Sequence, residues 1–225
     1  MTKKTLSGIL AAALLLLAAC DKTPQPPLVF GASAWPGYEP IYLARDQGYL
    51  QGVNLRLEDF KSPAETEEAF RSRKIHLAAL TLERALVLRR DIPDLKIILL
   101  LDDAPGKRMD VLVTRDESIG QYHHEMQQLL SGWRKAMDYM HSKPDMAAQA
   151  MAHREGVPPP QFNAALQAMQ LFSLQRNQQE MIGEPPPIGA SIEAAQRTLL
   201  NQGKLEIGVD PSMLLDSTLL AESPK

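Results

Sequence analysis

Short apolar runs alternate with helical stretches between Leu28 and Leu101, and few folds accommodate that order. The expected elements, in chain order, are strand 28–32, helix 38–48, strand 53–60, helix 63–72, strand 75–80, helix 81–89 and strand 96–101. Ser62 and Glu65 form a capping box around a proline in the first helical turn, which marks the start of the second helix. A β-α-β-α-β-α-β order predicts an α/β fold with a parallel-rich sheet, right-handed crossovers and helices on both faces.

The second half of the chain is predicted to be mostly helical. Apolar residues recur at three- and four-residue spacing in one stripe, formed by Tyr122, Met126, Leu129, Leu130, Trp133, Met137 and Met140. Further helices are expected over 146–153, 160–170 and 188–201. The methionines of the stripe are typical of core packing rather than of a copper or haem site.

The N-terminus has the layout of a secretory signal. Lys3 and Lys4 precede an apolar run over 9–19, which is shorter than the roughly 20 residues that a membrane span requires. The last four residues up to Cys20, Leu-Ala-Ala-Cys, resemble the lipobox of bacterial lipoproteins. We therefore predict that 1–19 is a signal peptide and that Cys20, the only cysteine, is lipidated. An ordinary secretory signal with an incidental cysteine is the alternative.

Lipidation at Cys20 predicts a location. A lipoprotein N-terminus carries three acyl chains, and each buried methylene contributes about 0.8 kcal/mol, so attachment should be permanent. Residues 20–27 contain three prolines and are expected to form a flexible tether. Asp21, by resemblance to enterobacterial lipoproteins, favours the periplasmic side of the inner membrane, with the outer membrane or cell surface as alternatives.

The charge of the chain excludes one class of partner. There are 24 Lys and Arg residues against 27 Asp and Glu residues, a net charge of −3. No basic cluster is long enough to follow a phosphate backbone, so nucleic acid is not an expected partner.

The carboxyl ends of the predicted strands are the expected ligand site. In open α/β sheets, ligands bind beyond these ends, which here carry 33–38, 61–62 and 81–82. Each segment lies at a helix N-terminus, where free N–H groups and the helix dipole favour an anionic ligand.

Several segments then resemble one family. Residues 31–44, GASAWPGYEPIYLA, resemble the opening of substrate-binding proteins of nitrate/sulfonate/taurine-type ABC importers, a group that also binds thiamine pyrimidine precursors. Residues 76–82 resemble the family's next characteristic block, and 132–139 and 144–148 resemble its C-terminal helices. The resemblance implies the type II periplasmic-binding-protein fold, an ABC permease as partner, a monomer, and binding of a small organic anion or amine without a cofactor.

The chain also departs from that family, whose members have two lobes. Residues 95–102 resemble the last strand before the chain crosses to the second lobe, and 105–114 resemble the returning strand. Only Asp103 and Ala104 separate them, so most of the second lobe is expected to be missing. The truncated lobe is predicted over 28–216, as a β/α half at 28–102 and a returning half at 105–216, with 217–225 as a tail.

Seven residues are predicted to bind the ligand: Ser33, Trp35, Gly37, Tyr38, Ser62, Thr81 and Leu82. Alternatives remain open for most of them. Trp35 and Tyr38 could instead anchor the loop by packing, and Ser62 and Thr81 could simply cap their helices.

Other polar residues have simpler predicted roles. Glu39 could bind a cationic amine or favour the dipole of its helix, and Asp102 and Asp103 are expected in a loop. His76, within an apolar strand, is expected to be buried and neutral. The histidines at 123, 124 and 141 lack partners at metal-ligand spacing, so no metal site is predicted.

The favoured function is therefore a membrane-anchored solute-binding protein of an ABC transporter. A single-lobe interaction or sensory lipoprotein, or a non-functional remnant, is the alternative. No enzyme is expected, because the chain shows no paired nucleophile and base, and it lacks the cysteine-rich motif of thiamine-pyrimidine synthases with this fold. The residues do not identify the solute.

Overall fold

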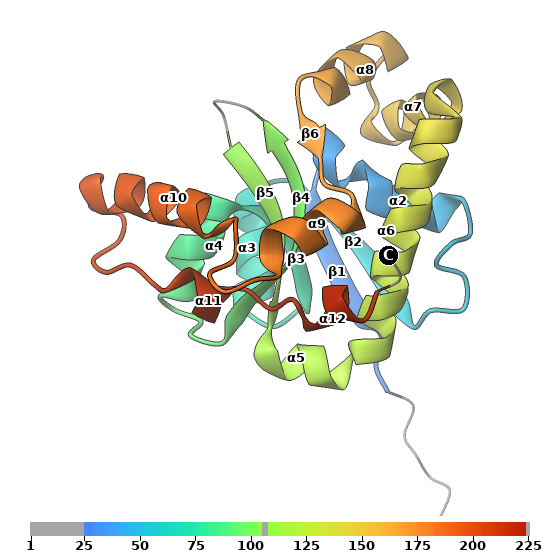
Figure 1. Cartoon of the computed structure of the whole chain (residues 1–225). Coiled ribbons are helices and arrows are strands. Elements are labelled where there is room, and N and C mark those ends of the chain that lie inside the picture. The colour runs from blue at the N-terminus through green and yellow to red at the C-terminus, as the bar shows by residue number, and fades with distance from the viewer. Residues whose placement is uncertain (1–24, 105–107, 224–225) are drawn as a thin grey trace, which may run out of the picture.

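The described strands form one mixed sheet in the order β2-β1-β3-β5-β4-β6 (Figure 1). Their bounds are β1 (Leu28–Ser33), β2 (Leu55–Phe60), β3 (Leu77–Thr81), β4 (Leu95–Ala104), β5 (Arg108–Arg115) and β6 (Gln170–Leu171). This computed structural model describes residues 25–104 and 108–223. The predicted signal peptide, the lipidation site Cys20 and most of the tether lie outside those residues.

The first part of the sheet has the predicted parallel strands. Strand β1 pairs in parallel with β2 and with β3. The connections are the 3-10 helix η1 (Pro36–Tyr38), α2 (Glu39–Asp46), α3 (Pro63–Arg71) and α4 (Leu82–Arg89). Right-handed crossovers place α2 on one face of the sheet and α3 and α4 on the other, as Figure 1 shows. The α/β fold class is thus confirmed.

The predicted returning strand is β5, which lies between β3 and β4. It pairs antiparallel with both, so β4 and β5 form a hairpin that stays within one sheet. The chain therefore returns directly into the lobe that it leaves, and the described residues form a single lobe.

One prediction at this hairpin was wrong. Asp102 and Asp103 were expected in a loop, but both belong to β4, opposite Asp110 and Met109 of β5. The strand continues past Leu101 because β5 offers backbone hydrogen-bonding partners as far as Ala104.

The second half is helical, as predicted, with additional short elements. Its helices are α5 (Asp116–Gln121), α6 (His123–Ser142), α7 (Pro144–Glu155), α8 (Pro159–Gln167), α9 (Leu174–Met181), α10 (Gly189–Asn201), α11 (Pro211–Leu214) and α12 (Thr218–Ala221). The stripe on α6 is packed against the core, with Met126 and Trp133 fully buried. Leu219 and Leu220 of α12 are also buried, so the packed part of the chain extends beyond Asp216. Among the described helices, none is long and apolar enough to cross a membrane.

The outer edge of β4 is covered by the C-terminal half. The Asn177 side chain accepts from Leu100 N–H at 2.6 Å and donates to Leu100 C=O at 3.0 Å, so it replaces a neighbouring strand. Backbone N–H groups of Phe172 and Asp216 donate to Leu101 and Ile97 at 3.0 and 2.9 Å. An unpaired edge would invite intermolecular pairing, and these contacts satisfy it within one chain.

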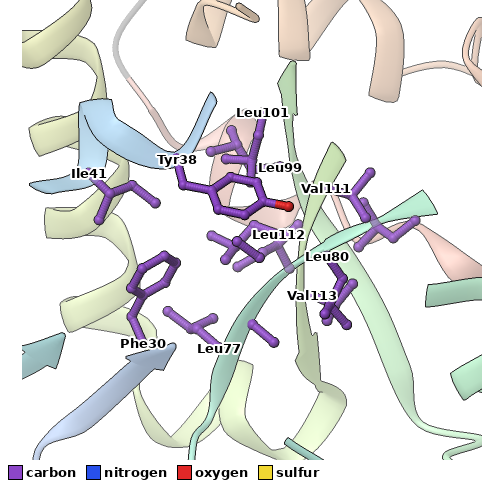
Figure 2. Close-up of a cluster of buried hydrophobic side chains, with 14 of the residues drawn as sticks. Phe30, Tyr38, Ile41, Leu77, Leu80, Leu99, Leu101, Val111, Leu112 and Val113 are labelled. Atoms are coloured by element: carbon purple, nitrogen blue, oxygen red, sulfur yellow. The ribbon is translucent and has the colours of Figure 1, made fainter. Parts of the chain in front are cut away.

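The core lies on both faces of β4 and β5. Every residue of β4 from Ile97 to Asp102 is buried, which requires cover on both faces. Figure 2 shows Tyr38 among the apolar side chains of this core, near Leu99 and Leu112, with its hydroxyl oxygen beyond them. The core therefore reaches the edge of the sheet where the ligand site is predicted.

Candidate functional site

The predicted ligand-binding residues lie along one edge of the sheet. Ser33 ends β1 in register with Phe60, the last residue of β2, and Thr81 ends β3 in register with Asp110. Because β5 is antiparallel, its first residues lie beside the carboxyl ends of β1 to β4. We call this end of the sheet, where β1 to β4 finish and β5 begins, the carboxyl edge.

Two of the predicted hydroxyl groups cap helices. Ser62 Oγ accepts from the Glu65 N–H at 3.2 Å, and Thr81 Oγ1 accepts from the Arg84 N–H at 3.2 Å. Glu65 reaches back to the N–H of Lys61 at 3.1 Å, one residue before the expected partner of a capping box. Leu82 is 3% exposed and Ser33 is 6% exposed, so the edge offers little open surface at either residue.

The two aromatic residues each donate to a buried carboxylate. Trp35 Nε1 donates to Asp102 Oδ2 at 3.0 Å, and Tyr38 Oη donates to Asp110 Oδ1 at 2.9 Å. Trp35 is half-buried, whereas the Tyr38 ring is enclosed by the core (Figure 2). Both side chains therefore already have polar partners within the lobe.

Gly37 is needed for the approach of Asp102. A Cβ atom at residue 37 would lie 1.8 Å from Asp102 Oδ2 and 2.6 Å from its Cγ. Any side chain there would displace the carboxylate, so the absence of Cβ allows the contact between η1 and β4.

Asp102 and Asp110 form a buried carboxylate pair that the sequence did not predict. They face each other across β4 and β5, and both have no exposed surface. Burial, reinforced by the charge of Asp110, raises the pKa of Asp102 to about 7. Burial likewise raises the pKa of Asp110 to about 6, although Arg108 and Tyr38 oppose the change. The carboxyl edge thus holds two acids that resist ionising together.

One oxygen of each carboxylate lacks a hydrogen-bond partner among the described residues. These atoms are Asp102 Oδ1 and Asp110 Oδ2. Arg108, the cation that the described residues place beside the pair, has Nε 3.4 Å from Asp110 Oδ2 and Cζ 4.0 Å from the centre of the Trp35 ring. A cation therefore lies on the aromatic ring beside the pair, without a hydrogen bond to either free oxygen.

Glu39 lies in the first turn of α2, where a carboxylate favours the helix dipole, as one of its two predicted roles requires. It is fully buried, and both of its oxygens accept from Arg154 of α7. Arg154 also lies 3.5 Å from the Tyr42 ring centre and contacts Asp59 at 3.0 Å. Burial raises the pKa of Glu39 to about 7, and the hydrogen bond and charge of Arg154 oppose that rise. This ion pair joins α7 to α2, so Glu39 does not face an open cleft.

His76 is held by hydrogen bonds. Its Nδ1 accepts from the Val29 N–H at 3.0 Å, and Nε2 lies 3.3 Å from Tyr122 Oη. Burial lowers the pKa of His76, which keeps the ring neutral as predicted, although the side chain is only partly buried. No group of three or more His, Cys, Asp or Glu residues is placed to hold a metal ion in the part of the chain that the structure describes.

Open pockets lie elsewhere on the described surface. A pocket of about 740 Å³ is lined by 183–187 and 210–212, and a groove of about 440 Å³ lies between α6, α7, α8 and β6. Neither includes any of the seven predicted residues. The predicted residues share an edge, but their side chains are used in caps, core and the carboxylate network.

Sequence reasoning missed Asp102, Arg108, Asp110 and Arg154. The sequence did contain a pattern that pointed to Asp110. In the predicted returning strand, Asp110, Leu112 and Thr114 lie on one face, so the acid shares that face with an apolar residue. No comparable signal pairs Arg154 with Glu39, 115 residues earlier.

Comparisons with known proteins agree on the fold. No protein-family model matches the chain, and no curated protein matches it significantly. Solved structures do match. The alkanesulfonate-binding protein of Xanthomonas axonopodis pv. citri, bound to MOPS, is 9% identical with a TM-score of 0.67, and the match covers 86% of this chain and 99% of that one.

Two further structures give the same picture. The periplasmic nitrate-binding protein of Synechocystis PCC 6803 is 10% identical with a TM-score of 0.66, over 88% of each chain. A ligand-binding component of an ABC-type import system from Staphylococcus aureus, with zinc bound, is 11% identical with a TM-score of 0.68, over 89% of this chain and 99% of that one. The chain therefore has the periplasmic-binding-protein fold, in a single-lobe form.

Proposed function

We propose that this protein is a membrane-anchored solute-binding protein that presents a small organic ion to an ABC permease, with the carboxyl edge of its lobe as the binding surface. The observation that carries the proposal is the fold, because structural neighbours of this chain bind sulfonates and nitrate. Trp35, Tyr38, Ser62 and Thr81 lie along the edge where open α/β sheets bind ligands.

Lipidation of Cys20 would give the binding lobe its location. A tethered lobe stays at high effective concentration beside a membrane permease, so weak capture can still support uptake. The test is metabolic labelling of the full chain with a radioactive fatty acid in a bacterial host. We expect label and membrane fractionation in the native chain and loss of both in Cys20→Ser. Unlabelled native chain in the soluble fraction would contradict the anchor.

A single lobe should bind its solute weakly. Two-lobed binding proteins enclose a ligand between opposing walls, whereas one lobe excludes water poorly. The chain without residues 1–20 keeps every described contact and can be screened by thermal shift against sulfonates, nitrate, taurine, aminopyrimidines and simple amines. We expect shifts only at millimolar concentrations. A rise of many degrees at micromolar concentration would contradict the half-site.

One observation favours a second function, that of an interaction lipoprotein. The groove between α6, α7 and α8 is lined mainly by apolar residues, including Met140, Met151 and Leu166. A partner protein could occupy it without any solute. Crosslinking in cells distinguishes the two functions. A transport protein should crosslink to a permease whose associated ATPase activity responds to solute, whereas an interaction lipoprotein should crosslink to a partner that shows no such response.

A further inference from the structure

The carboxyl edge holds two buried acids, which is unexpected for a surface that binds sulfonate or nitrate. Asp102 and Asp110 are buried beside each other, and the charges of Asp103 and Glu83 act on them in turn. In the part of the chain that the structure describes, Arg108 is the cation that contacts the pair. An anion placed here would meet two buried acids, whereas a cation would relieve their repulsion.

Each acid also has one oxygen that accepts no hydrogen bond from the described residues. Trp35 and Tyr38 satisfy Asp102 Oδ2 and Asp110 Oδ1, and the remaining oxygens have no hydrogen-bond partner among the described residues. Leaving a buried carboxylate oxygen unpaired is costly, so native structures rarely retain one without a role. Two such oxygens on facing residues can accept from one planar donor with several N–H groups, such as a guanidinium.

Arg108 shows which chemistry the edge accepts. Its guanidinium stacks on Trp35 with Cζ 4.0 Å from the ring centre, and its Nε lies 3.4 Å from Asp110 Oδ2. The Arg108 side chain is 36% exposed, so solvent reaches it, whereas both acids are fully buried. Aromatic stacking combined with carboxylate pairing is how proteins hold organic cations.

We propose that Asp102, Asp110 and Trp35 form a recognition site for a guanidinium or primary ammonium group, and that Arg108 occupies this site as a tethered stand-in for the ligand. The inference rests on the proposed solute-binding function for its location, and it narrows the ligand class from anion or amine to cation. A cationic solute displaces Arg108 from Trp35 and donates to the two free oxygens. Arg108 thereby sets a threshold for binding, because a ligand must compete with a cation that is always present.

Removal of the stand-in tests the proposal. Arg108→Ala in the chain without residues 1–20 should open the site, and methylguanidinium should then bind in its place. With a dissociation constant near 1 mM, 10 mM methylguanidinium at pH 8 should raise the melting temperature of this variant by about 3–6 °C. The rise should be at least threefold smaller in the native chain, where Arg108 competes.

Two controls identify the site. The rise should disappear in Arg108→Ala combined with Asp110→Asn, which removes one free carboxylate. Arg197→Ala removes the same charge from an exposed pair with Glu193, 3.6 Å apart, and should respond like the native chain. If Arg108→Ala does not fold, Arg108→Gln keeps the packing and removes the charge, and the same shifts are expected.

Other outcomes overturn the proposal. An equal response in Arg197→Ala would assign the rise to non-specific binding. A folded Arg108→Ala or Arg108→Gln variant that does not respond to methylguanidinium would show that the pair is not a cation site. Binding of methanesulfonate or nitrate to the native chain, without a response of Arg108→Ala to methylguanidinium, would overturn the cationic class while leaving the solute-binding function standing.

Discussion

The protein buries carboxylates in two places and treats them differently. Glu39, between α2 and α7, receives hydrogen bonds from Arg154 on both oxygens. Among the described residues, Arg108 lies beside Asp102 and Asp110 at the carboxyl edge, and it donates a hydrogen bond to neither Asp102 Oδ1 nor Asp110 Oδ2. All three acids are fully buried, so burial alone does not separate the two sites.

The difference lies in whether the charge is compensated. A buried carboxylate that accepts two hydrogen bonds from one arginine has its hydrogen-bonding needs met within the protein. Removing that arginine should affect only stability. A buried pair whose oxygens do not all accept hydrogen bonds can bind a further donor. We therefore regard the Glu39–Arg154 pair as a brace between helices and the Asp102–Asp110 pair as the candidate site.

The largest loss of stability is expected when the Glu39–Arg154 ion pair is broken. Arg154→Ala leaves Glu39 buried without its cation and should lower the free energy of unfolding by about 3–5 kcal/mol at pH 8. Chemical denaturation measures it. Arg197→Ala, at an exposed pair, should cost less than about 0.5 kcal/mol. Equal losses in the two variants would mean that Glu39 is not held as an ion pair.

A smaller loss of stability is expected from a change in η1, which packs against Asp102. Gly37→Ala directs a methyl group into the Asp102 carboxylate and should cost about 1–3 kcal/mol. Gly120→Ala is the matched control, because its Cβ would meet nothing within 4 Å, and it should gain about 0.5–1 kcal/mol within a helix. A neutral Gly37→Ala would contradict the close approach of Asp102.

The third prediction concerns pH. A carboxyl group whose pKa is raised in the folded state binds its proton more tightly there than in the unfolded chain. The free energy of unfolding should therefore fall as pH rises from about 4 to about 7, since the pKa of Asp102 is raised to about 7. Asp102→Asn should make this fall shallower, by on the order of 1–2 kcal/mol. Asp138→Asn, at a side chain 69% exposed, should leave the slope unchanged. The same slope in both variants would argue against the raised pKa.

The smallest loss of stability is expected for Ser62→Ala, a variant that also distinguishes helix capping from ligand binding. Ser62→Ala removes the hydrogen bond to Glu65 and should cost about 1 kcal/mol of unfolding free energy. The response of Arg108→Ala to methylguanidinium should be the same with and without this second change. A lost response would return Ser62 to the binding site.

Much of the fold could be predicted because it depends on local patterns. The strands and helices up to β5 lie within a few residues of their predicted bounds, since apolar periodicity and caps such as Ser62 and Thr81 are encoded within a few positions. The short elements η1, α5, α9, α11, α12 and β6 were missed. Strand β6 has two residues, and α9 is a polar helix that depends on contacts such as that of Asn177 with β4.

The candidate site was predicted only in outline. Its edge followed from the alternation of strands and helices, whereas the partners on that edge did not. Trp35 meets Asp102 across 67 residues, and Tyr38 meets Asp110 across 72. Such contacts depend on how the segment 35–38 packs against β4 and β5, which no local pattern specifies.

The amino-acid sequence by itself determined an α/β lobe, the order of its main elements and the helix caps, and it predicted the edge where a ligand is expected to bind. These follow from hydrophobic periodicity and backbone hydrogen-bonding needs, which act over one or two helical turns. Only the tertiary structure decided which buried acids are compensated. The insertion of β5 between β3 and β4 brings Asp110 opposite Asp102 and leaves Arg108 over Trp35. Whether a charge is satisfied depends on atoms that strand pairing brings together, and here that pairing places two buried acids opposite each other at the carboxyl edge.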